Sequence, residues 1–278
     1  MSSIYVLIII CFKQREEIVI IMKSLREKKG FICDMDGVLY HGDNVLPGAK
    51  DFVKWLQSEK KEFLFLTNNS SKTRKELQIR LSNMGIKVEE EHFYTSALAT
   101  ANFLKNQCPG GSAYVIGDAG LTNAIYDAGF SINNTNPDYV VLGETRTYNY
   151  EMMEKATQLV LAGAKLIGCN YDMTGPTETG IAPASRALIA PIEMATGKTA
   201  YFVGKPNPLM MSHGLSLLGV KKEDAAIIGD RMDTDIVAGM ESSIDTILVL
   251  SGVTSLETMA DFAYRPKYIF DGIGDIIT

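Results

Sequence analysis

Acidic side chains follow two apolar runs that lie at opposite ends of the chain. Asp34 and Asp36 come directly after residues 31–33, and Asp230 follows residues 225–228 and one glycine. Both runs are typical of buried strands. Because the carboxyl ends of parallel strands meet at one edge of a sheet, where ligands bind, we expect these carboxylates to lie close together. Hard oxygen ligands of this kind suit Mg²⁺.

Asp34 and Asp36 are separated by one residue and followed by Gly37, where the chain must turn. One carboxylate of such a pair can attack phosphorus, while the other protonates the leaving oxygen and later takes a proton from water. Gly37 lets backbone N–H groups of the turn approach the phosphoryl oxygens. The Asp-x-Asp pattern alone is more typical of a solvated turn. The remaining segments favour the catalytic interpretation.

Thr67 and Asn68 follow a second apolar run, residues 63–66. Their side chains can donate hydrogen bonds to the same phosphoryl oxygens, and we assign them to the ligand. The residues that come next are of types that cap helices, and we expect them to cap the following helix: Asn69, Ser70 and Ser71.

Lys205 lies between Gly204 and Pro206, which restrict its backbone. A compact cation there can neutralise both a phosphate and the nucleophile. Asp235 either supports Lys205 or a metal-bound water, or is a first-turn residue of the next helix, where the helix dipole favours it. We interpret Asp233 as a surface residue.

Strands and helices alternate along the chain, which indicates a doubly wound parallel α/β sheet, Rossmann-like in organisation. In the first part of the chain the expected strands are residues 31–33 and 63–66, and the expected helices are residues 49–60, 72–84 and 96–106.

A second α/β unit is expected as an insertion. The turn-forming segment Cys108-Pro109-Gly110-Gly111 marks a domain boundary, and strands and helices alternate again after it. From Tyr201 the chain is expected to return to the first sheet. Residues 24–106 and 201–278 would therefore form a core, and residues 107–200 an inserted domain. The elements expected beyond residue 111 are strands at 114–116, 139–142, 166–169, 225–228 and 246–250 and helices at 121–128, 150–162 and 208–218.

The composition is that of a globular protein and favours a small-molecule partner. The chain has 278 residues, 46% of them hydrophobic, which is enough for a full core. Acidic residues outnumber basic ones by 33 to 27, and the net charge of −6 argues against a nucleic-acid surface. The cysteines stand singly, without zinc or disulfide spacing, which favours a reducing cytoplasm: Cys11, Cys33, Cys108 and Cys169.

The N-terminal segment is unusual. Residues 4–12 are strongly apolar, but charged residues interrupt the pattern before residues 18–21. The run is too short for a membrane span of about 20 residues, and it lacks the basic start and cleavage site of a signal peptide. We expect residues 1–23 to be an extension outside the fold, and a chain that begins at Met22 to fold and work normally.

Together, these segments resemble the four signature motifs of the haloacid dehalogenase-like phosphatases. The inserted unit resembles the large α/β cap of the NagD and p-nitrophenylphosphatase branch, as do residues 34–40, 67–70 and 204–206. The resemblance covers nearly everything from Met22 onward. It implies an enzyme that works through an aspartyl-phosphate with Mg²⁺.

The resemblance also implies roles for individual residues. Asp34 would be the nucleophile and a Mg²⁺ ligand, and Asp36 the general acid and base, which also binds the metal through its backbone carbonyl. Asp230 would be the third protein ligand. Residues expected to hold the phosphoryl group are Thr67, Asn68 and Lys205, with Gly37 and Asp235 in support.

Residues 169–172 occupy the place where this branch has Asn-Pro-Asp, in a loop of the cap that faces the active site. Asn170 and Asp172 are the expected substrate-binding residues, and Tyr171 replaces the usual proline, which changes the loop's shape. A polar stretch beside it could touch the leaving group or only cover the domain junction: Thr174, Thr177, Glu178 and Thr179.

The leading functional hypothesis is a cytoplasmic, Mg²⁺-dependent phosphatase for small phosphomonoesters such as nucleoside monophosphates, sugar phosphates, glycerol phosphate or phosphoglycolate. A cap that closes on the sheet edge excludes large polymers. The alternatives are a phosphotransferase of the same fold and a non-catalytic protein that binds phosphorylated metabolites. No nucleic acid or membrane partner is expected, and a homodimer through the cap remains open.

Overall fold

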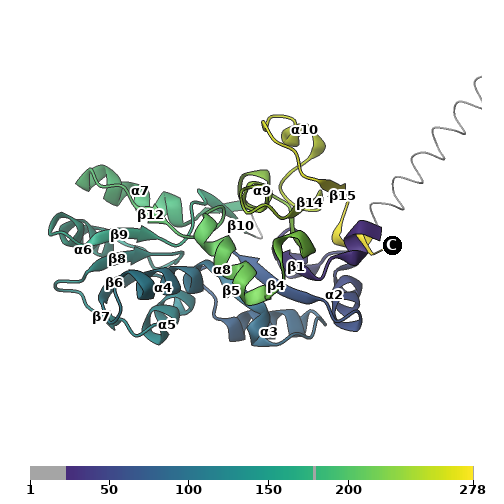
Figure 1. Ribbon diagram of the computed structural model, residues 1–278. Coiled ribbons are helices and arrows are strands. Elements are labelled where there is room, and N and C mark those ends of the chain that lie inside the picture. The colour runs from purple at the N-terminus through teal and green to yellow at the C-terminus, as the bar shows by residue number, and fades with distance from the viewer. Residues whose placement is uncertain (1–22, 178–179, 278) are drawn as a thin grey trace, which may run out of the picture.

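A computed structural model of the chain describes residues 23–177 and 180–277. It contains two separate parallel sheets with helices packed against them, the first at the right and the second at the left of Figure 1. The predicted doubly wound α/β class with a second α/β unit is confirmed. The predicted extension, residues 1–23, lies outside the described residues apart from Lys23. Within the described residues, no helix is both long and apolar enough to cross a membrane.

The first sheet has six parallel strands in the order β15-β14-β13-β1-β4-β5. Strand β1 lies between β13 and β4, so the residue that follows it is central at the carboxyl edge. Two later segments of the chain therefore end beside it. The strands are β1 (Gly30–Cys33), β4 (Glu62–Thr67), β5 (Phe93–Thr95), β13 (Ala225–Gly229), β14 (Asp245–Val249) and β15 (Tyr268–Phe270).

Helices cover both faces of this sheet because its buried strands are apolar on both sides. Phe31 of β1 belongs to one apolar cluster together with Phe52, whereas Ile32 belongs to a second cluster together with Met210. The helices of this part are α2 (Ala49–Ser58), α3 (Arg74–Asn83), α4 (Ser96–Gln107), α8 (Pro208–Leu218), α9 (Val237–Glu241) and α10 (Leu256–Met259).

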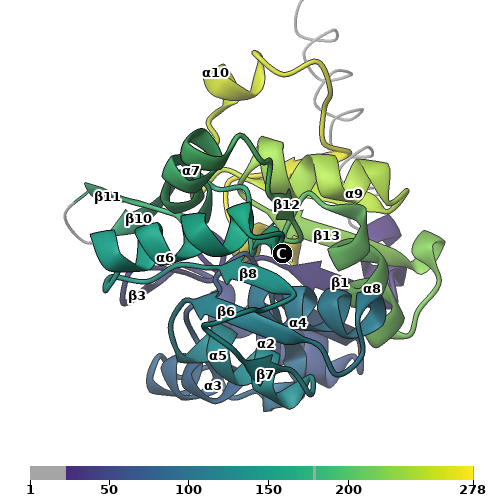
Figure 2. The same ribbon diagram turned by 90° about the vertical axis from the view of Figure 1, so that its left-hand side faces the viewer.

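The second sheet has five parallel strands in the order β12-β9-β8-β6-β7. Figure 2 shows α6 and α7 on one side of this sheet and α5 on the other. An antiparallel hairpin, β10 with β11, follows β9. The elements are β6 (Ser112–Ile116), α5 (Ala119–Asp127), β7 (Ser131–Ile132), β8 (Tyr139–Leu142), α6 (Tyr150–Leu161), β9 (Lys165–Gly168), β10 (Thr174–Thr177), β11 (Gly180–Pro183), α7 (Ser185–Thr196) and β12 (Tyr201–Phe202).

The structure corrects the prediction that the chain returns to the first sheet at Tyr201. Tyr201 pairs with Ile167 and Phe202 with Gly168, so β12 is an edge strand of the second sheet. A run of two or three apolar residues fits either sheet, and only the pairing partner distinguishes them. The chain returns just after β12, in the segment that carries Lys205.

A second correction concerns the start of α3. Its N-cap is Thr73, whose side chain accepts from the backbone N–H of Glu76 while the Glu76 side chain accepts from Thr73 in return. Asn69 instead closes a turn before the helix, because its side-chain oxygen accepts from the backbone N–H groups of Ser71 and Lys72.

Candidate active site

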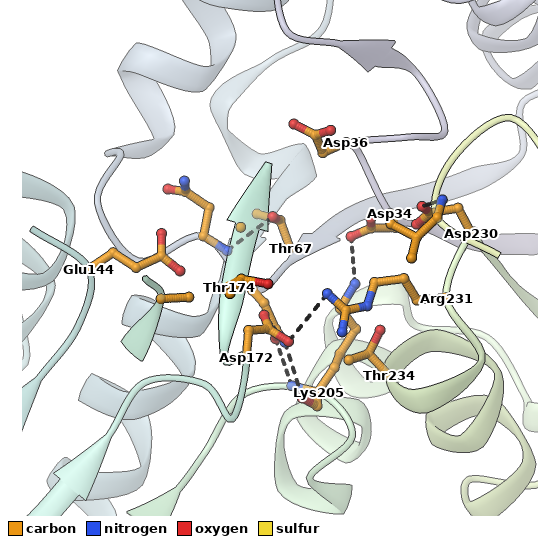
Figure 3. A pocket seen from close by; sticks show the side chains of 15 residues that line it. Asp34, Asp36, Thr67, Glu144, Asp172, Thr174, Lys205, Asp230, Arg231 and Thr234 are labelled. Atoms are coloured by element: carbon orange, nitrogen blue, oxygen red, sulfur yellow. Dashed lines mark hydrogen bonds and ion pairs between the residues drawn. The ribbon is translucent and has the colours of Figure 1, made fainter. Parts of the chain in front are cut away.

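The carboxyl ends of β1, β4 and β13 meet at a pocket of about 190 Å³. Side chains of the second domain close its other side, as Figure 3 shows for Asp172, Thr174 and Glu144. Most of the predicted site residues line this pocket, whereas Gly37, Asn170 and Asp235 are not part of the lining. The predicted residues in the lining are Asp34, Asp36, Thr67, Asn68, Asp172, Lys205 and Asp230.

Lys205 is the electrostatic centre of the site. Its side chain is almost fully buried, and its Nζ lies 2.5 Å from Asp34 Oδ1 and 2.6 Å from Asp235 Oδ1. It also donates to the carbonyl oxygen of Leu66 at 3.0 Å. Burial alone would lower the Lys205 pKa, but the two carboxylates outweigh burial and raise it. The ammonium therefore stays charged and holds the carboxylate of Asp34 in place.

The backbone of Lys205 is held by Asn68. The Asn68 side-chain oxygen accepts from the Lys205 N–H at 2.8 Å, and its Nδ2 donates to the Lys205 carbonyl oxygen at 3.1 Å. A side chain at Gly204 would put its Cβ 2.7 Å from that same Asn68 oxygen, so glycine permits the close approach. The Lys205–Pro206 peptide bond is cis. Asn68 thus positions Lys205 as well as lining the pocket.

Three carboxylates gather beside this lysine. Asp34, Asp230 and Asp235 place one oxygen each within 4.8 Å of one another. Burial raises the pKa of Asp34, against the effect of Lys205. Burial and the charge of Asp235 raise the pKa of Asp230 to about 7. One ammonium does not balance three carboxylates, so the donor set fits a divalent cation with oxygen ligands.

Asp36 differs from Asp34 in its surroundings. Its side chain is 43% exposed, and one carboxylate oxygen lies 3.8 Å from His41 Nδ1. Partial burial raises the Asp36 pKa, while His41 and Arg80 oppose the rise. A partly exposed carboxyl group with a raised pKa at the pocket mouth suits proton transfer with a leaving group and water. In Figure 3, Asp36 lies apart from Lys205, across the pocket.

Thr67 is the last residue of β4 and is largely buried. Its hydroxyl oxygen accepts from the backbone N–H of Asn69 at 3.1 Å, which leaves the hydroxyl proton free to donate. Thr67 lines the pocket, and its role in holding a phosphoryl group stays a prediction.

The loop after β9 joins the two domains. Fully buried Asn170 donates to the carbonyl oxygen of Asn68 at 2.7 Å and to Glu144 Oε1 at 3.1 Å. Asp172 accepts from Asn68 Nδ2 at 3.0 Å, and its other oxygen lies 3.8 Å from Arg231 Nη1. Burial raises the Asp172 pKa, opposed by Arg231 and Asn68. Asn170 therefore organises the loop, whereas Asp172 reaches the pocket.

Tyr171, which stands in place of the usual proline, points away from this polar cluster. Its exposed ring packs edge to face against Phe202, with centroids 5.0 Å apart, and lies 5.5 Å from the Arg186 guanidinium. Of the polar stretch that follows, Thr174 lines the catalytic pocket; Glu178 and Thr179 lie outside the described residues.

The sequence reasoning missed two charged residues of this pocket, Glu144 and Arg231. Glu144 follows strand β8 and one glycine, the same pattern that identified Asp230, so the signal was present in the second sheet. Arg231 follows Asp230 directly. Its guanidinium donates hydrogen bonds to the Asp233 carboxylate at 2.8 and 3.0 Å and also faces Asp172.

Comparison with known proteins agrees with this arrangement. Residues 31–131 match a family model described as haloacid dehalogenase-like hydrolase, and residues 202–276 match one described as HAD-hydrolase-like. The dihydroxyacetone phosphatase of Corynebacterium glutamicum is 44% identical over 88% of this chain and 90% of its own length. The ribonucleotide monophosphatase NagD of Escherichia coli is 42% identical over 89% of this chain and 98% of its own.

Solved structures give the same result. The structure of NagD from Escherichia coli has a TM-score of 0.84 at 41% identity, covering 89% of this chain and 97% of its own. A 4-nitrophenylphosphatase from Thermotoga maritima has a TM-score of 0.87 at 34% identity, covering 91% and 98%. The chain therefore belongs to the haloacid dehalogenase-like hydrolases, in the branch that contains NagD and the nitrophenylphosphatases.

Proposed function

We propose that this hydrolase is a Mg²⁺-dependent phosphatase that cleaves small phosphomonoesters through a phosphorylated Asp34. The observation that carries the proposal is the contact between the buried Lys205 ammonium and one oxygen of Asp34, at 2.5 Å, on the floor of the pocket. That contact orients the carboxylate and opposes the rise in the Asp34 pKa that burial causes, which favours the ionised form that a nucleophile requires. Relatives named dihydroxyacetone phosphatase, ribonucleotide monophosphatase NagD and acid sugar phosphatase support the reaction class.

The reaction has two steps. Asp34 attacks phosphorus, the bond from phosphorus to the ester oxygen breaks, and Asp36 gives its proton to the departing alcohol. Asp36 then takes a proton from water, whose oxygen attacks phosphorus and releases inorganic phosphate and the Asp34 carboxylate. Thr67, Asn68 and Lys205 bind the phosphoryl oxygens in both steps.

The carboxylates of Asp34 and Asp230 and the backbone carbonyl of Asp36 would hold Mg²⁺. When bound, the ion supplies positive charge that offsets the repulsion between the carboxylates and an incoming phosphate. The unbalanced charge of the Asp34, Asp230 and Asp235 cluster supports this assignment.

The division into domains belongs to the same proposal. Residues 24–106 and 201–278 would form the catalytic core and residues 107–200 the cap, although β12 shows that the cap's sheet extends past the second boundary.

A pocket of about 190 Å³ is smaller than a usual drug-sized ligand site, which favours a small leaving group. We further infer a cytoplasmic enzyme, because the described cysteines are free. A homodimer through the cap stays a prediction that a mass measurement in solution tests.

The test is phosphate release from p-nitrophenyl phosphate and a panel of small phosphomonoesters, with Mg²⁺ and with chelator. We expect metal-dependent release in the unaltered protein and a loss of at least about a thousandfold in Asp34→Asn. Asp51→Asn, on the exposed side of α2, is the matched control. After a rapid acid quench, phosphate should remain attached to the unaltered protein and not to Asp34→Asn.

Each contrary result points elsewhere. Phosphate release that Asp34→Asn retains would contradict the covalent route. Consumption of the ester only in the presence of an alcohol acceptor would identify a phosphotransferase, and binding without turnover would identify a regulatory protein.

A further inference from the structure

Glu144 lies at the carboxyl edge of the second sheet, directly after β8 and Gly143. Its backbone N–H donates to the Ser70 hydroxyl of the first domain at 2.8 Å, which fixes the loop against the core. Its side chain lines the same pocket as Asp34. Figure 3 shows the two carboxyl groups on opposite sides of that pocket. Glu144 therefore lies where a substrate's leaving group would project.

Only one oxygen of Glu144 has a protein partner. Oε1 accepts from Asn170 Nδ2 at 3.1 Å, whereas no described residue donates a hydrogen bond to Oε2. An oxygen without a protein partner is left for water or a ligand to satisfy. The free oxygen thus provides an unused hydrogen-bonding position inside the catalytic pocket.

The surrounding charges limit what that oxygen can bind. Asp172 and Asp118 are the charged groups that act on Glu144, and both are acidic. The cations of the pocket pair with other carboxylates: Lys205 contacts Asp34 and Asp235, and the Arg231 guanidinium lies 3.8 Å from Asp172. Burial, with some help from the two aspartates, raises the Glu144 pKa to about 7. An anionic leaving group would be repelled here, while a neutral hydroxyl can pair with the carboxyl in either protonation state.

We propose that Glu144 binds a hydroxyl group of the leaving alcohol, so that the cap selects phosphate esters of glycerol-type and sugar-type polyols over aromatic and carboxylate-bearing ones. The inference rests on the proposed phosphatase function and names the chemical class of its substrate. Thr174, which lines the same side of the pocket, offers a further hydroxyl to such a ligand.

The experiment compares kcat/KM for glycerol phosphate, p-nitrophenyl phosphate and phosphoglycolate in the full chain. Glu144→Ala removes the carboxyl group, and Glu144→Gln keeps an oxygen for Asn170 while it removes the charge. We expect Glu144→Ala to lower kcat/KM for glycerol phosphate roughly tenfold more than for p-nitrophenyl phosphate, mainly through KM. Glu151→Gln, at an exposed position on α6, is the control.

Phosphoglycolate gives the sharper readout, because structural damage cannot produce a gain. Glu144→Gln should raise kcat/KM for phosphoglycolate relative to glycerol phosphate, since the repelling charge is gone. Equal losses for all three esters in both variants would overturn the inference and leave Glu144 as a support for Asn170. If the unaltered protein hydrolyses p-nitrophenyl phosphate, that result leaves the phosphatase proposal standing; if it hydrolyses none of the esters, both fail.

Discussion

Lys205 stands between two carboxylates that water barely reaches. The side chain of Asp235 is 1% exposed and that of Asp34 is 13% exposed, so neither could be solvated easily if the ammonium were removed. A buried ion pair adds little stability over an apolar equivalent, but removing one partner is expensive because the other charge remains. Lys205 is therefore expected to stabilise the folded state in addition to its proposed role in the reaction.

Replacing Lys205 with methionine should lower the free energy of unfolding by about 3–5 kcal/mol. Urea denaturation followed by circular dichroism measures the change. Lys54→Met is the control, because the Lys54 side chain is 72% exposed and its contact with Asp51 spans 3.6 Å. A loss in Lys205→Met no larger than in Lys54→Met would show that water reaches the carboxylates after all.

The polar residues at the ends of strands were predictable because a parallel sheet brings such ends together. Asp34, Thr67 and Asp230 meet as expected. The structural role of Asn170 was not predictable. Its amide donates hydrogen bonds to the Asn68 carbonyl oxygen and to Glu144, whereas the sequence predicted a substrate-binding residue. The type of a residue shows which chemical groups it can offer. The direction of its side chain depends on loop packing, which cannot be read from a single sequence.

The turn after β1 packs closely against Asp230, one of the proposed metal ligands. Gly37 has φ +76°, and a Cβ there would lie 2.5 Å from Asp230 Oδ2. Asp230 in turn accepts from the backbone N–H of Val253 at 2.7 Å, so it has little room to move. A side chain at position 37 would therefore collide with the Asp230 carboxylate.

Gly37→Ala should raise the Mg²⁺ concentration needed for half-maximal activity by about tenfold, because the methyl group displaces the Asp230 carboxylate. Gly42→Ala is the matched control: Gly42 also has positive φ, +55°, but a Cβ there meets no atom within 4 Å. Both variants carry backbone strain of about 1–2 kcal/mol. Mg²⁺ titrations that do not distinguish them would show that the turn does not control the metal site.

Short elements and those with unusual composition escaped prediction. Strand β5 has three residues and β7 two, too few to show a period. Helix α7, which the sequence reasoning did not predict, contains Pro191 in its interior, where proline normally disfavours a helix. By contrast, α8 begins at Pro208 after an Asn cap and ends before Gly219, and its predicted bounds, 208–218, are confirmed.

On the scale of the whole molecule, the two domains share one apolar cluster. Leu66 and Met210 of the core belong to it together with Val141 and Ile167 of the second sheet. The polar contacts of Asp172 with Asn68 and Arg231 lie at the pocket end of this junction. The predicted insertion is consistent with this arrangement, but the shared cluster depends on how the sheets face each other, which strand patterns do not specify.

Asp172→Ala should lower kcat/KM about tenfold to a hundredfold for every ester, because it removes the acceptor that ties the cap to Asn68. Asp172→Asn keeps an acceptor oxygen, so its kcat/KM should fall less than that of Asp172→Ala. Asp127→Ala, exposed at the end of α5, controls for loss of an acidic residue from the same domain. Unchanged kinetics in Asp172→Ala would mean that the cap is positioned by the apolar cluster alone.

The short link between β12 and Lys205 limits how this enzyme could exchange one cap for another. Val203 and Gly204 make up the whole link, and their N–H groups bond to the carbonyl oxygens of Gly168 and Cys169 in the second domain. Recombination at this downstream junction would shift the catalytic ammonium unless the spacing were kept. The upstream junction near Gly110 is exposed, and exposed loop positions are where insertions are usually tolerated. Related enzymes with new substrate specificities should therefore vary in the length of the upstream junction and keep the length of the downstream junction.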